Sequence, residues 1–164
     1  MATLSESDLR HLRAAIALSH KARQRGNGAY GALLVGADGR VLMDAENSRF
    51  TANDATGHAE LNLVRAATGA HDAQTLAAAT LYASAEPCAM CAGAIFWSGV
   101  KRVVYALSAD RNYALLESSD DELRIGCREV FGKGKRKVEV LGPALEEEAA
   151  AAFSEQNPQA ARTA

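Results

Sequence analysis

Three residue types that would point to particular classes of protein are scarce in this sequence. Its 164 residues include only three prolines and three cysteines, and 5% of them are aromatic. Three cysteines cannot all pair within one chain, so metal or redox chemistry explains them better than a set of disulfides. The few aromatic residues count against a surface that stacks the bases of a nucleic acid.

Long apolar runs and an excess of one charge are also missing. No run approaches the roughly 20 apolar residues of a membrane-spanning helix, and residues 1–15 lack the apolar stretch of a signal peptide. The sequence therefore predicts a cytoplasmic protein with no membrane partner. Lysine and arginine number 18 against 20 acidic residues, for a formal net charge of −2. Such a balance gives no general attraction to phosphate backbones.

The chain also lacks the marks of several domains. It has no internal repeat and no linker rich in proline or glycine, and its 48% hydrophobic and 23% charged residues are ordinary for a globular protein. We expect a single domain over residues 1–154, followed by a flexible tail over residues 155–164.

Apolar residues alternate between strand and helix periods along the chain. A capping box at Ser5 begins a helix over 5–25, and "ADG" joins two strands in a hairpin. Strands are predicted at 30–36, 40–46, 79–84, 101–107 and 136–142, and helices at 57–68, at 88–98, within 110–130 and from Pro143. This order indicates an α/β fold, a three-layer α/β/α sandwich with a central mixed five-stranded sheet.

Potential metal ligands lie at the predicted starts of two helices. His58 begins "HAE", and Cys88 and Cys91 belong to "PCAMC", where a spacing of three puts both thiolates on one helical face. One imidazole and two thiolates supply three of the four ligands of a tetrahedral Zn²⁺. An open fourth position is the mark of a catalytic zinc, and Glu60 is then free to move the proton of a bound water.

Two other interpretations of this group remain open. The metal could be structural, in which case Cys127 is the one spare thiol that could complete the set. Alternatively the same residues could simply be buried on apolar faces, and Cys127 could be a small core residue. Glu60 argues for the catalytic interpretation, since a structural site has no use for it.

The pattern H-x-E…P-C-x-x-C is the signature of zinc deaminases, and "HAE…EPCAMCAGAI" resembles the cytidine deaminase-like superfamily. Within it, the chain is most similar to the bacterial guanine deaminase and nucleoside deaminase branch, followed by the tRNA adenosine deaminases. The resemblance spans roughly residues 5–110. It implies the same sandwich fold, a Zn²⁺ cofactor, hydrolytic release of ammonia from a base, and a homodimer.

The resemblance also implies a set of substrate-binding residues. Asn47 stands eleven residues before His58, where guanine deaminases have an asparagine that binds the base, although it could instead cap a turn. Trp97 falls on their pocket tryptophan, although it could be a core residue. The other candidates are Tyr30 in "AYGA", Ala59 in "HAE", and Asp120 and Asp121 in "SSDD", the counterpart of an acidic motif that holds the exocyclic amine of the base.

Three functions follow from these observations. The first is deamination of a free nucleobase or nucleoside, guanine-like first and cytosine-like second. The second is deamination of adenosine in tRNA, which would require basic segments such as "GKGKRK" at 132–137 to form one track rather than a solvated face. The third is a zinc scaffold without catalysis. The acid-leaning charge and Trp97 argue against the second, and Glu60 against the third.

Overall fold

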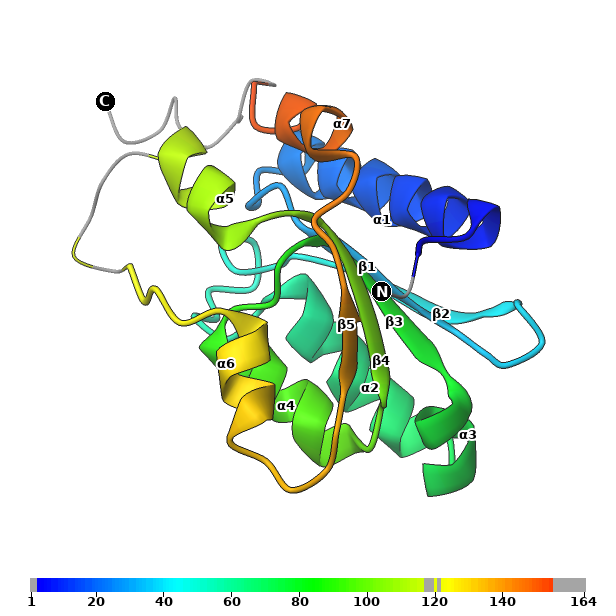
Figure 1. The fold of residues 1–164 in the computed structure, drawn as a ribbon. Coiled ribbons are helices and arrows are strands. Elements are labelled where there is room, and N and C mark those ends of the chain that lie inside the picture. The colour runs from blue at the N-terminus through cyan, green and yellow to red at the C-terminus, as the bar shows by residue number, and fades with distance from the viewer. Residues whose placement is uncertain (1–2, 117–119, 121, 155–164) are drawn as a thin grey trace.

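The structure is a computed structural model that describes residues 3–116, 120 and 122–154 (Figure 1). The predicted tail at 155–164 and Asp121 lie outside the described residues. The helices are α1 (Glu6–Gln24), α2 (Ala59–Ala70), α3 (Ala73–Ala78), α4 (Ala89–Ser98), α5 (Ala109–Leu115), α6 (Cys127–Gly132) and α7 (Glu146–Ala151). The strands are β1 (Gly31–Val35), β2 (Val41–Glu46), β3 (Thr80–Ala85), β4 (Arg102–Leu107) and β5 (Glu139–Leu141).

The five strands form one mixed sheet in the order β2-β1-β3-β4-β5. Strand β1 runs antiparallel to both β2 and β3, whereas β3, β4 and β5 are parallel. Helices cover both faces, with α1 and α7 on one side and α2, α4 and α6 on the other (Figure 1). The predicted three-layer α/β/α sandwich is therefore confirmed.

Side chains that alternate along each strand contribute to two separate hydrophobic cores, one on each face of the sheet. Leu33 and Val104 pack against Leu12 of α1, while Leu34 and Val103, their neighbours along the strands, pack on the opposite face with the helices that carry the metal-ligand candidates. This alternation is the period-two pattern of strands buried on both faces. It seats α2 and α4 on the same side of the sheet.

Two local predictions differ from the structure. The short helix α3 was not predicted, although Asp72 caps it by accepting a hydrogen bond from the backbone N–H of Thr75 at 2.8 Å. The last helix begins at Glu146 rather than Pro143, because Leu145 has a φ of 61°. That left-handed backbone cannot continue a right-handed helix, so Pro143 lies in the connection instead.

A buried ion pair joins α1 to the middle of the sheet. The Asp8 carboxylate is 4% exposed and accepts hydrogen bonds from Arg102 Nη1 at 2.8 Å and from Tyr82 Oη at 2.7 Å. Burial alone would raise the pKa of Asp8, but hydrogen bonds from Arg102, Ser5 and Tyr82 lower it well below its usual value. The ionised carboxylate is thus part of the folded structure.

We predict that Asp8→Asn lowers the free energy of unfolding by about 3 kcal/mol at pH 7, because it leaves the Arg102 guanidinium without its buried partner. The pKa of Asp8 is lowered on folding, so the carboxylate stabilises the fold above its unfolded pKa of about 3.9 and ceases to do so as the pH falls through the folded value. Urea unfolding should therefore show the gap between variant and wild type narrowing below about pH 4.

The matched control is Glu139→Gln, which removes the exposed partner of the same Arg102 at 2.9 Å. An exposed pair of this kind contributes about 0–1 kcal/mol. Equal losses in the two variants would contradict the assignment of the larger effect to burial.

Candidate active site

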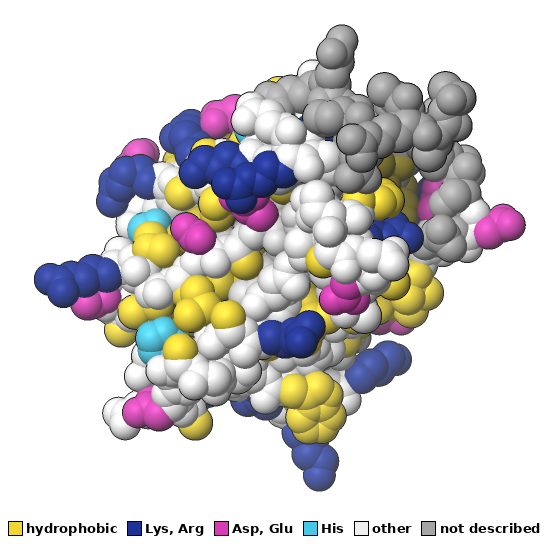
Figure 2. All heavy atoms as spheres, turned by 180° about the vertical axis from the view of Figure 1, so that it is seen from behind, with side chains coloured by type: hydrophobic (Ala, Val, Ile, Leu, Met, Phe, Trp, Pro, Cys, Tyr) yellow, Lys and Arg dark blue, Asp and Glu magenta, His cyan; other side chains and the backbone are white. Residues whose placement is uncertain are grey.

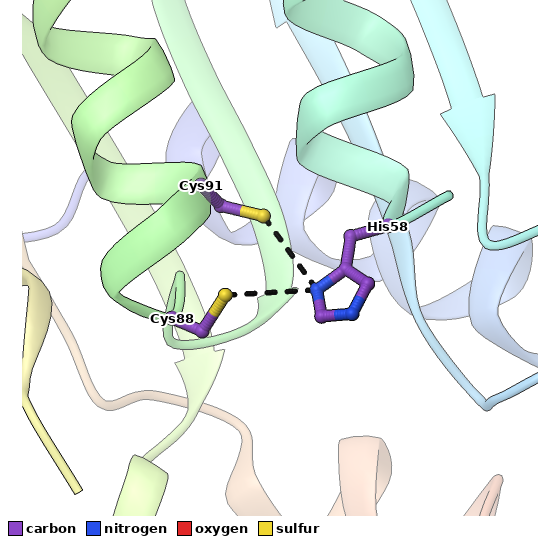
Figure 3. Close-up of side chains that lie close together, drawn as sticks. All are labelled: His58, Cys88 and Cys91. Carbon is purple, nitrogen blue, oxygen red and sulfur yellow. Dashed lines mark hydrogen bonds between the residues drawn. The ribbon is translucent and has the colours of Figure 1, made fainter. Parts of the chain in front are cut away.

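The three potential metal ligands meet where two helices begin side by side. His58 is the N-cap residue of α2, Cys88 is the N-cap residue of α4, and Cys91 lies in the first turn of α4. Figure 3 shows both sulfur atoms directed at the same edge of the imidazole ring. The packing of α2 and α4 on one face of the sheet brings together residues that are 30 and 33 positions apart in the sequence.

The spacing of the donor atoms fits a tetrahedral zinc. His58 Nδ1 lies 3.6 Å from Cys88 Sγ and 3.7 Å from Cys91 Sγ, and the three ligand atoms all lie within 4.8 Å of one another. Zinc bonds of about 2.3 Å to sulfur and 2.0 Å to nitrogen, at a tetrahedral angle, separate the two ligand atoms by roughly 3.5 Å. The donor set, one imidazole and two thiolates, is also one that zinc prefers.

Cys127 does not complete this set. Among the residues that the structure describes, the only group of three or more potential ligands is that of His58, Cys88 and Cys91. Cys127 is instead buried in the hydrophobic core beneath α6. The structural-zinc interpretation that relied on Cys127 as a fourth ligand is therefore wrong, and the fourth position is left for a molecule from the cavity.

Hydrogen bonding between the ligands gives the two thiols different pKa values. The Cys91 thiol interacts with Cys88, which lowers the pKa of Cys88 to about 4 with further help from His58. The same interaction and burial raise the pKa of Cys91. The hydrogen bond to Cys88 also raises the pKa of His58. Zinc binds cysteine as the thiolate and histidine as the neutral imidazole, so binding would release the protons that these ligands still carry.

Glu60 is a carboxyl group buried beside the ligands. It lies in the first turn of α2, is 5% exposed, and lines the same cavity as His58 and Cys88. Burial raises the pKa of Glu60 to about 7. No ion pair of the described residues neutralises it, so Glu60 is available to exchange a proton with a molecule in the cavity.

The cavity has a volume of about 580 Å³ and contains several of the predicted substrate-binding residues. Asn47 and Tyr30 line it together with His58, Glu60 and Cys88. Tyr30 Oη donates a hydrogen bond to Asn112 Oδ1 at 3.1 Å, and burial raises the pKa of Tyr30 to about 12. Ala59 is fully buried within α2 and is not among the lining residues.

The prediction that Trp97 lines the cavity is wrong for a single chain. Trp97 is 85% exposed and contacts Phe96 with ring centroids 5.6 Å apart. It stands nine residues after Cys88, and a rise of about 1.5 Å per residue carries it to the far end of α4. Although Trp97 belongs to the same helix as the cysteines, its ring lies at the opposite end of that helix.

Of the acidic pair predicted at 120–121, the structure describes only Asp120. Asp120 is exposed and does not line the cavity, and Asp121 lies outside the described residues. Glu122 lines it instead, and one of its oxygens accepts a hydrogen bond from Arg124 at 2.9 Å. Asp120 therefore does not contribute to the cavity wall, whereas a role for Asp121 stays a prediction; an irregular segment has no period that fixes which side chains point inward.

Several further lining residues were not predicted at all. They come from segments that are far apart in the sequence, and of them only Met90 stands within the zinc-ligand motif: Arg23, Arg49, Phe50, Met90, Asn112, Tyr113 and Phe153. Phe153 follows α7 and packs edge-on against Tyr30 with ring centroids 5.6 Å apart. Asn112, Tyr113 and Phe153 reach the cavity only through the tertiary packing of α5 and of the segment that follows α7.

Glu86 ties the zinc-ligand segment to two other helices. Its carboxylate accepts a hydrogen bond from the backbone N–H of Ala109 at 3.1 Å, at the start of α5, and another from Cys127 at 3.0 Å, at the start of α6. Negative charge is stabilising at a helix N-terminus. Because Glu86 stands two residues before Cys88, it fixes both helices relative to the metal ligands.

Comparison with known proteins agrees with this geometry. Residues 5–107 match the family model described as "Cytidine and deoxycytidylate deaminase zinc-binding region". A probable cytosine deaminase of Schizosaccharomyces pombe is 41% identical over 148 residues, which cover 89% of this chain and 90% of the relative. The chain resembles a solved guanine deaminase from Nitrosomonas europaea in fold, with a TM-score of 0.74 and 22% identity over 93% of this chain and 85% of the other.

Other relatives match over shorter regions. The guanine deaminase of Bacillus subtilis is 43% identical over 79 residues, covering 48% of this chain and 50% of the relative. A tRNA-specific adenosine deaminase of Haemophilus influenzae is 39% identical over 106 residues, covering 63% and 60%. Members of this family are zinc-dependent hydrolases that act on C–N bonds, and the arrangement of His58, Cys88 and Cys91 fits their metal. The chain belongs to the cytidine and deoxycytidylate deaminase zinc-binding family.

Proposed function

We propose that this enzyme deaminates a free nucleobase or nucleoside, guanine-like first and cytosine-like second. The observation that carries this proposal is that Glu60 and Asn47 open into one cavity with the metal ligands. A volume of about 580 Å³ lies in the usual range for small-molecule sites. It leaves room for a bicyclic base, which is why guanine stands first.

The chemistry of the proposed reaction can be assigned to residues. His58, Cys88 and Cys91 would hold Zn²⁺, which when bound lowers the pKa of a water molecule to about 7. Glu60 takes one proton from the water and passes it to a ring nitrogen; it then takes the second proton, from the hydroxyl added to the ring carbon, and gives it to the departing amine. A C–O bond forms, the exocyclic C–N bond breaks, and the products are the oxo base and ammonia.

Asn47 supplies a reason to prefer a base with a carbonyl group. The side chain is 4% exposed, and its Oδ1 accepts a hydrogen bond from the backbone N–H of Arg49 at 3.1 Å, which fixes the amide. No described residue accepts a hydrogen bond from its Nδ2. Since buried donors are normally satisfied, a carbonyl oxygen of the substrate would complete the site. Guanine and cytosine carry such an oxygen, whereas adenine does not.

A deamination panel tests the proposal. Ammonia release would be measured with guanine, cytosine, adenine and their nucleosides, alongside inosine formation in tRNA. We expect turnover of a small oxo base, with weak dependence on salt between roughly 50 and 200 mM, because no phosphates need to be neutralised. Editing of tRNA with no reaction on any small substrate would support the alternative, a tRNA adenosine deaminase.

We predict that Asn47→Ala raises KM for the best small substrate and lowers kcat/KM by about 10–100-fold, the cost of losing one hydrogen bond in a buried site. Val41→Ala serves as the comparison, because Val41 is an exposed residue on β2 that does not line the cavity. Steady-state kinetics at matched zinc content would measure both. Equal kinetics for Asn47→Ala and wild type would contradict a role for Asn47 in binding the base.

We also propose a homodimer, formed through the outer face of α4. Met90, which also borders the cavity, and Trp97 are exposed on this helix, with the half-buried Ala94 between them at helical spacing. Figure 2, the view from behind, shows a protruding hydrophobic side chain at the lower edge of the molecule with Lys and Arg side chains around it. A helix that is apolar all round usually has a covering partner.

Light scattering should therefore give the mass of a dimer at micromolar concentration. Trp97→Glu should shift the protein toward the monomer, because it places a charge in the middle of an apolar contact. Val41→Glu is the matched control, since Val41 is an exposed apolar residue on β2, at the edge of the sheet. A monomeric wild-type mass would refute the homodimer.

A further inference from the structure

A second concave site lies between α6 and β5, apart from the catalytic cavity. It has a volume of about 420 Å³, and four basic residues line it: Arg128, Lys135, Arg136 and Lys137. Phe131, Val138 and Val140 supply its apolar wall. The connection from α6 to β5 forms the lower end of the molecule in Figure 1. None of these residues lines the catalytic cavity. We call this site the basic groove.

The positive charge of the basic groove is not neutralised by the described part of the chain. Residues 132–137 read "GKGKRK", four cations with no acid among them. The cations that line the groove are Arg128 and the last three of this stretch. None of them takes part in a described ion pair. Of the neighbouring acids, Glu139 is held by Arg102 at 2.9 Å, and Glu129 is exposed on α6.

Two of the cations are held in place by the fold. Arg136 Nη1 donates to the backbone carbonyl of Val100 at 3.0 Å, and its guanidinium lies over the Phe96 ring at 4.4 Å. Arg128 Nη2 donates to the carbonyls of Val140 and Gly142 at 3.1 and 3.0 Å. An arginine has five N–H donors, so each guanidinium keeps donors for a ligand. The groove is therefore partly organised before anything binds.

The backbone of the groove also follows a constrained path. A Cβ atom on Gly134 would lie 2.3 Å from Cε2 of Phe96, the ring under Arg136. A side chain at position 134 would force the Phe96 ring or the connection to move, so glycine lets the connection pass close to α4 next to Lys135 and Arg136.

We propose that the basic groove binds an organic phosphate of the size of a mononucleotide. Guanidinium and ammonium groups are the side chains that recognise phosphate, and the apolar wall offers a surface for a ring. The volume suits a small molecule. A polynucleotide would need a continuous basic track, whereas outside this groove the charges are mixed and the whole chain carries a net charge of −2.

Calorimetric titration of the zinc-loaded protein with UMP, uridine and inorganic pyrophosphate tests this proposal. UMP carries no exocyclic amine, so deamination cannot contribute heat. We expect UMP and pyrophosphate to bind and uridine to bind much more weakly. Lys135→Ala/Lys137→Ala should weaken UMP binding by at least about tenfold, because it removes two charge-assisted contacts. Arg136→Lys keeps the charge but loses the planar arrangement of N–H donors, so this variant should also bind UMP more weakly.

The control is Arg10→Ala/Lys21→Ala, which removes two cations from α1 on the other side of the sheet and should leave UMP binding unchanged. Zinc content, thermal unfolding and deaminase activity should be the same in both double variants. Equal UMP affinity in Lys135→Ala/Lys137→Ala and wild type would overturn the proposal. Binding of an oligouridylate without binding of UMP would also overturn it, in favour of an RNA surface.

Discussion

Glu60→Gln should lower turnover of the best substrate by about 10²–10⁴-fold, the usual contribution of a positioned acid or base. Glutamine keeps the shape of the side chain and much of its hydrogen bonding, but it cannot take a proton from water and return it to the leaving amine. Because Glu60 is not one of the three clustered ligands, the zinc content should remain at about one per chain. The loss should therefore appear in kcat with little change in substrate affinity.

Single-turnover kinetics and metal analysis on the same preparation would measure this effect. Glu122→Gln is the matched control, since Glu122 also lines the cavity but is held by Arg124. We expect this control to change substrate affinity more than the rate of the chemical step. Near-normal turnover by Glu60→Gln would show that another group moves the proton.

Cys88→Ser should release the metal and abolish activity with it. A serine hydroxyl stays protonated near neutral pH and is a poor zinc ligand, whereas the pKa of the Cys88 thiol is already lowered to about 4. The wild type should contain about one zinc per chain, and the variant far less after dialysis against a weak chelator. Cys127→Ala is the control, because this buried cysteine lies outside the ligand group. Full zinc occupancy in Cys88→Ser would refute the ligand assignment.

The metal centre could be predicted from the sequence because its chemistry is local. His58 and the cysteine pair each stand at a helix start, and a spacing of three within one helix fixes which side chains share a face. The fold was equally accessible, since strand and helix periods alternate clearly between Gly31 and Leu107. The short helix α3 was missed, and the start of α7 was misplaced because the left-handed backbone of Leu145 has no signal in its residue type.

The cavity wall could be predicted only in part. Asn47 was identified through the resemblance to guanine deaminases, which have an asparagine at the same distance before the zinc histidine. Trp97 was misassigned because belonging to the zinc helix says nothing about which end of that helix a side chain occupies. The contributions of Asn112 and Phe153 depend on how α5 and α7 pack over the site. That packing follows from contacts between residues more than 80 positions apart, such as the hydrogen bond from Tyr30 to Asn112.

Because Glu86 binds the first N–H groups of both α5 and α6, the segment between these helices can change in sequence while its two ends stay in place. The stretch between α5 and α6 begins and ends on helices whose first N–H groups bind the same carboxylate. Substitutions or insertions within that stretch can alter the rim of the cavity while both attachment points stay fixed beside Cys88. The enzyme can therefore acquire a new substrate preference through this segment without disturbing its metal ligands. Glu86 thus separates a fixed chemical centre from a segment whose sequence can change.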